Sequence, residues 1–143
     1  VSGWTRLGYV APMIAGLTLQ GNADARAHTS RNKWHELSPL ANNDFWYLGV
    51  RHGAFIGGVS FAALGNYNAN RKTRIRFVKD TAAVILIGSA LFDVAYSFER
   101  SGRPVMDLAS CYNHDGNKIG ISKKGMVWFN VSRLAVGIYL LVK

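Results

Sequence analysis

The stretch FWYLGVRHGAFIGGVSFAALG, residues 45–65, decides how the rest of the chain is interpreted. Its 21 residues are about the length that an α-helix needs to cross a hydrocarbon layer of ~30 Å. Three aromatic side chains open it, as is typical of a helix that begins at a membrane interface. Gly49, Gly53 and Gly57 follow four residues apart and share one helical face. Such a face allows another backbone, or a flat ring, to approach closely.

His52 borders this glycine face, because it follows Gly49 by three residues and is turned by about 60° around the helix. A lone histidine at membrane depth beside such a face suggests an axial ligand for the metal of a tetrapyrrole, since neutral imidazole is a common metal ligand. A hydrogen bond between helices explains His52 equally well, and the glycine face fits both interpretations.

Two further apolar blocks, residues 81–98 and 126–142, are separated from the first by polar stretches. Because 49% apolar residues would also suit a soluble protein, the clustering carries the prediction rather than the total. We predict an all-α membrane protein with three transmembrane helices, at about residues 45–65, 78–98 and 126–142. Residues 45–143 form the transmembrane domain in this interpretation.

Residues 1–44 are predicted to form a long extramembrane N-terminal segment. The apolar run around Pro12 is too short to cross a membrane, so we expect an extended or interfacial segment that lies on partner proteins. A short helix after Pro12 is the alternative, since proline is tolerated in a first helical turn.

The chain is strongly basic, with 17 Lys and Arg residues against 8 Asp and Glu residues and a net charge of +9. Five of these cations and no acid lie in residues 66–79, which we predict to be a loop. Because the aromatic residues lie mostly in or beside apolar blocks, the charges are interpreted as flanks of membrane helices, with anionic lipids as partners and no nucleic acid. A basic soluble protein of a ribonucleoprotein particle is the competing class.

No catalytic function is predicted. Cys111 is the only cysteine, so an intrachain disulfide is ruled out. His114 and Asp115 lie together in a predicted turn without a serine or cysteine motif. Arg51 and Asp93 fall inside apolar blocks. Arg51 is expected to reach the near interface by snorkelling or to pair with a carboxylate of a neighbouring chain, because an unpaired charge in a membrane costs a few kcal/mol. For Asp93 we expect a polar contact with another helix or with the interface.

Three runs of the sequence resemble the photosystem I subunit L family. The first joins Leu-Ser-Pro-Leu at residues 37–40 to Leu-Gly-Val-Arg-His-Gly at residues 48–53. The second is the block that begins Val-Ile-Leu-Ile at residue 84 and ends Ala-Tyr-Ser-Phe at residue 98, and the third holds Trp-Phe at residues 128–129 and Tyr-Leu-Leu at residues 139–141. The resemblance covers residues 37–142.

The resemblance implies a photosystem I core subunit with three transmembrane helices in the chloroplast thylakoid membrane. It implies bound chlorophyll a and carotenoid, with His52 as the ligand of a chlorophyll magnesium. The position of a second family ligand, a glutamate, holds Tyr47. The expected role is light harvesting without catalysis, in contact with other subunits of the complex and with light-harvesting antenna.

The alternative is a small accessory membrane subunit of a respiratory complex in the mitochondrial inner membrane. Anchor subunits of succinate dehydrogenase are similar in having three spans and a Ser-Pro start before the first helix. Their haem histidine lies in the second helix, whereas residues 81–98 contain no histidine. In this alternative His52 is a hydrogen-bonded packing residue.

Overall fold

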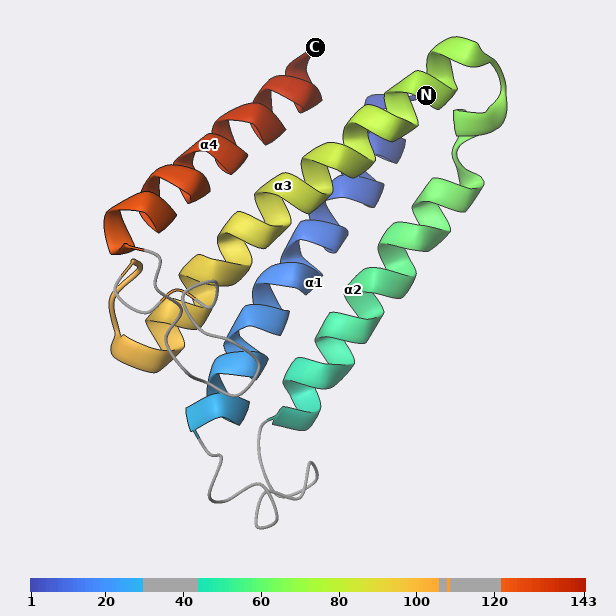
Figure 1. Cartoon of the computed structure of the whole chain (residues 1–143). Helices are drawn as coiled ribbons and strands as arrows, with labels where there is room; N and C mark the ends of the chain where they lie inside the picture. The colour runs from blue at the N-terminus through green and yellow to red at the C-terminus, as the bar shows by residue number, and fades with distance from the viewer. Residues whose placement is uncertain (30–43, 106–107, 109–121) are drawn as a thin grey trace.

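The computed structural model describes residues 1–29, 44–105, 108 and 122–143 (Figure 1). Within these ranges, residues 27–29 and 44–48 are described by their backbone alone. The described residues form four α-helices and one 3-10 helix and contain no strand, so the all-α prediction is confirmed. In chain order the elements are α1 (Gly3–Thr29), α2 (Asp44–Leu64), η1 (Asn66–Asn68), α3 (Arg71–Ser101) and α4 (Lys123–Val142).

The helices lie side by side in the order α2, α1, α3, α4 (Figure 1). α1 packs against both α2 and α3, and α3 also packs against α4, so α1 and α3 are the inner helices. α1 and α3 run in one direction and α2 and α4 in the other, which brings the two ends of the chain to the same end of the array as the start of α3 (Figure 1).

Two helices, not three, are apolar enough to cross a membrane in the described part of the chain. They are α3, with 31 residues, and α4, with 20 residues. The expected helix at residues 45–65 is present as α2, but the prediction that it spans is wrong on the same criterion. Arg51 and His52 lie side by side near its middle, and an arginine at a helix centre costs about 2.5–3.5 kcal/mol on insertion scales.

The N-terminal segment is a helix of 27 residues rather than an extended or interfacial segment. Pro12 lies well inside this helix, although proline removes one backbone hydrogen bond and crowds the carbonyl four residues earlier. The sequence therefore argued against a long helix here. Packing on two neighbouring helices supplies the stability that local propensity lacks.

The basic stretch at residues 66–79 is also helical for most of its length, and the loop prediction is wrong from Arg71 onward. α3 begins there because Asn70 and Thr73 form a reciprocal capping box, in which each side chain accepts from the other residue's backbone N–H. Its first turns carry the basic residues. Its last turn ends at Gly102, whose φ of 68° is the left-handed conformation that glycine favours at a helix end.

Glycines bring the inner helices into close contact. A side chain at Gly21 on α1 would place its Cβ 2.3 Å from the carbonyl oxygen of Phe92 on α3. Gly88 on α3 makes room for Leu17 of α1 in the same way. A buried apolar cluster between α1, η1 and α3 forms the core, and it consists of Tyr9, Val10, Tyr67 and Val84.

Candidate functional site

The face of α2 that carries Gly49, Gly53 and Gly57 is open. A Cβ built at any of these three glycines would meet no atom of the described residues within 4 Å, apart from the neighbouring backbone of α2 itself. Gly58, on the opposite side, packs instead against Met13 and the carbonyl of Tyr9 on α1. The glycine face predicted from the sequence is therefore not used for packing among the described helices, and it is accessible to a partner.

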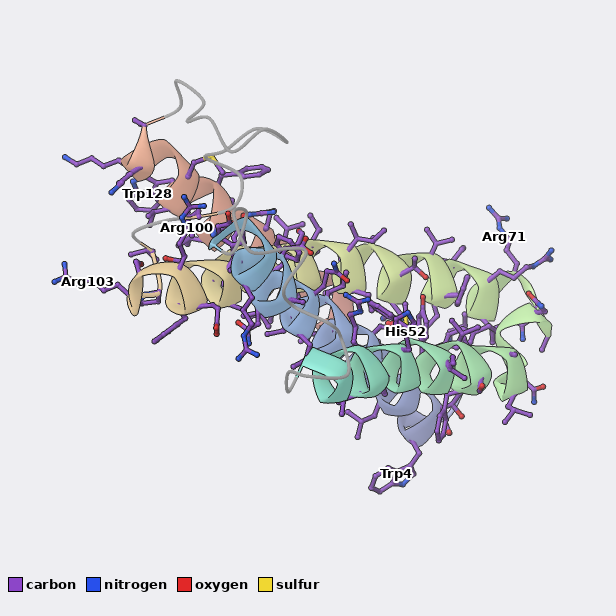
Figure 2. The ribbon with its side chains drawn as sticks, turned by 90° about the horizontal axis from the view of Figure 1, so that it is seen from below. Trp4, His52, Arg71, Arg100, Arg103 and Trp128 are labelled. Atoms are coloured by element: carbon purple, nitrogen blue, oxygen red, sulfur yellow. The ribbon has the colours of Figure 1, made fainter. Side chains whose placement is uncertain are left out.

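His52 lies about midway along α2 and is exposed (Figure 2). It lies beside the glycine face, as the sequence predicts. His52 also takes part in an interaction within the chain. The side chain of Tyr47, at the position of the second family ligand, lies outside the described part of the chain.

A buried carboxylate, Asp80 on α3, is the centre of a charge cluster at the end of the array where α3 begins. Asp80 has no exposed surface. Arg6 of α1 binds it in a bidentate manner, with Nε donating to Oδ2 and Nη2 donating to Oδ1, each at 2.9 Å. Arg76, one turn before Asp80, donates from Nε to Oδ1 at 3.0 Å. Two guanidiniums therefore share one carboxylate, and the cluster keeps a positive charge.

Tyr67 of η1 completes this cluster by donating its hydroxyl to Asp80 Oδ2 at 3.1 Å. Burial raises the pKa of the Tyr67 phenol above its ordinary value near 10, and the negative charge of Asp80 raises it further. The phenol therefore stays protonated at neutral pH and remains a donor. Tyr67 also packs edge-on against Tyr9 and Phe77, with ring centroids 6.1 Å and 5.0 Å away.

The same two arginines hold the last turn of α4. Arg6 Nη2 donates to the carbonyl oxygen of Leu141 at 2.7 Å, and Arg76 donates to that of Leu140. The last carbonyls of a helix have no partner within the helix and carry the negative end of its dipole, so cations stabilise them. The cluster thus joins α1, η1, α3 and α4.

A second buried ion pair joins α3 to α4 near the other end. Arg133 Nη2 lies 2.5 Å from Asp93 Oδ2 and also binds Asn130 Oδ1. The guanidinium carbon of Arg133 lies 4.4 Å from the ring centre of Phe129. Of the two contacts expected for Asp93, the structure shows the one with another helix, and Asp93 and Asn130 are both buried there.

No group of three His, Cys, Asp or Glu side chains in the described residues could hold a metal ion. His114, Asp115, Cys111 and His35 lie outside the described residues, as does the side chain of His28. Among the residues that the structure describes, His52 is therefore the one predicted ligand position that can be placed.

Sequence reasoning missed the Asp80 cluster. The spacing of four between Arg76 and Asp80 is typical of a helical ion pair, but it carries this meaning only if residues 66–79, predicted as a loop, are helical. Arg6 is 74 residues away from Asp80 and Leu141 is 135 residues away from Arg6, and no local pattern connects them.

No family model, curated protein or solved structure matches this chain.

Proposed function

We propose that this protein is a non-catalytic membrane subunit that holds neighbouring subunits together in a larger membrane complex. The observation that carries the proposal is the surface of α4. This helix is apolar enough to span, yet only 17% of its most apolar window is buried. The core helix of a soluble protein would be mostly buried, so the surface of α4 calls for lipid or for partner helices.

Large exposed apolar side chains also lie on the other helices. On α4 they include Trp128, Val136, Ile138 and Tyr139, and α2 adds Ile56, Val59 and Leu64. The buried carboxylates Asp80 and Asp93, by contrast, are each paired with arginines of this chain. Charges that are paired inside and apolar groups that face outward are the arrangement that a hydrocarbon environment favours.

We propose a second, more specific role, chlorophyll binding at His52 of a photosystem I subunit, because the glycine face beside His52 is open. One axial nitrogen and a helix surface with little side-chain bulk are what a chlorophyll ring needs, and the three glycines reduce that bulk beside His52. Chlorophyll supplies the absorption of light, and this chain would contribute the imidazole and a rigid helix that fixes the position of the ring. The respiratory-complex alternative assigns His52 to packing.

The test is to purify the native complex that contains this chain in mild detergent and to record its absorption spectrum. We expect other membrane proteins to co-purify, and we expect a chlorophyll band in the red. His52→Leu should lower the ratio of chlorophyll to protein. Val59→Leu, at an exposed position of α2 turned by about 120° from Gly53, is the matched control and should leave that ratio unchanged.

The outcomes separate the proposals. Haem bands without chlorophyll would overturn the photosystem assignment and favour a respiratory complex. Equal chlorophyll content in the wild type and the His52→Leu variant would overturn the ligation of chlorophyll by His52 and leave the other proposals standing. Purification of the chain without any other membrane protein would overturn the wider proposal of a complex subunit.

A further inference from the structure

We propose that a cavity at the start of α3 binds the phosphate headgroup of an anionic phospholipid. The cavity has a volume of about 450 Å³ and is lined by residues from the start of α1, the first turns of α3 and the end of α4. Those that matter to the argument are Arg6, Lys72, Ile75, Arg76, Lys79 and Lys143. The inference rests on the proposed membrane location and adds a ligand class and a site to it.

Among the described residues, the lining is cationic, with five basic side chains and no acidic one. Asp80 lies behind it and is shared by Arg6 and Arg76, so one carboxylate offsets two guanidiniums. Lys72 is exposed, and the ammonium of Lys79 reaches a backbone carbonyl only at 3.4 Å. A phosphate in the cavity would balance this charge and accept from the two ammonium groups.

The cavity also borders an apolar surface. Ile75 lines it and is 48% exposed, and Val78, further along α3, is 65% exposed. Phospholipids combine an anionic headgroup with apolar chains, so the headgroup would meet the lysines while the chains follow the exposed side of α3. Free phosphate or an acidic peptide would use the charges and leave this apolar surface uncovered, which is why we favour a lipid.

The site lies at one end of the array, where a headgroup layer would meet α3 if α3 spans. Arg71 marks this end, and Arg100 and Arg103 mark the opposite end of α3 (Figure 2). Lys123 and Lys124, both exposed, begin α4 at that opposite end. These two lysines provide a matched control, because their removal changes the net charge equally without touching the cavity.

The test is native mass spectrometry of the full chain in detergent, titrated with phosphatidylglycerol and, separately, with phosphatidylcholine. We expect phosphatidylglycerol to bind more tightly than phosphatidylcholine. The double variant Lys72→Gln and Lys79→Gln should weaken the binding of phosphatidylglycerol by about tenfold or more, since each lysine near an anionic headgroup contributes about fivefold. The double variant Lys123→Gln and Lys124→Gln should weaken it by less than about twofold, since those lysines lie away from the site.

Equal weakening by both double variants would overturn the site, because attraction would then follow net charge alone. Displacement of phosphatidylglycerol by inorganic phosphate would overturn the assignment to a lipid. Circular dichroism checks that the helix content of each variant is unchanged. Extraction of the wild type from membranes with salt and alkaline carbonate tests the membrane location separately. If the chain resists this extraction and both double variants weaken phosphatidylglycerol binding equally, the lipid site is wrong and the membrane location stands.

Discussion

Among single residues, Asp80 is the one whose substitution we expect to lower the free energy of unfolding most. It is fully buried and accepts from Arg6, Arg76 and Tyr67. Removing one partner of a buried ion pair leaves the others without compensation, which costs about 3–5 kcal/mol. We therefore expect Asp80→Asn to lower the free energy of unfolding by several kcal/mol, measured by thermal or denaturant unfolding in detergent.

Asp24 is the control for that experiment. It lies on α1, is partly exposed, and accepts from Gln20 one turn earlier at 2.7 Å. A hydrogen bond of this kind contributes about 0.5–1.5 kcal/mol, so Asp24→Asn should have a small effect. If both variants unfold at the same point as the wild type, the cluster around Asp80 contributes little to stability.

At the scale of elements, the contact between α1 and α3 depends on Gly21. A methyl group at this position would meet the backbone oxygen of Phe92 at 2.3 Å, and backbone cannot move aside as a side chain does. We expect Gly21→Ala to push the two helices apart and to cost about 1–3 kcal/mol, as overpacked sites do. Thermal unfolding of the isolated chain in detergent measures this loss of stability.

Gly53 on α2 provides the opposite case. In the part of the chain that the structure describes, no atom beyond the neighbouring backbone of α2 lies within 4 Å of a Cβ built there. Gly53→Ala should therefore be neutral or stabilise the isolated chain by up to about 1 kcal/mol through helix propensity. A loss of stability equal to that of Gly21→Ala would mean that the face of α2 is packed and not open, and would remove the basis for pigment binding there.

At the scale of the whole molecule, the exposed apolar surface predicts behaviour in extraction. We expect the chain to stay in the membrane fraction after washing with high salt and with alkaline carbonate, and to be released by detergent. A known peripheral protein of the same membrane is the control and should be released by carbonate. Release of this chain by salt alone would contradict a membrane location and favour the ribonucleoprotein alternative, in which binding is electrostatic.

The arrangement of the four helices explains which parts of the molecule can hold partners. α1 and α3 are covered on two sides by other helices, whereas α2 and α4 flank the array (Figure 1). The open glycine face and the exposed side of α4 therefore lie on the two outer helices. Partner subunits or lipids can cover both without disturbing the inner pair.

The sequence by itself determined the helical class and the places of three helices. Residues 78–98 and 126–142 fall within α3 and α4, and residues 45–65 match α2 to within one residue at each end. These predictions succeeded because an apolar run of helical length is a local signal. The sequence also placed Gly49, Gly53 and Gly57 on one face, since helical periodicity requires only the spacing.

Two features come from the tertiary structure and not from local sequence: residues 3–29 form an inner helix, and Asp80 is shared by two helices and a 3-10 turn. Pro12 made a long helix unfavourable locally, and contacts with α2 and α3 outweighed it. The pairing of Arg6 with Asp80 spans 74 residues of sequence. Such pairs depend on which helices become neighbours, and that is set by packing across the whole chain rather than by any one segment.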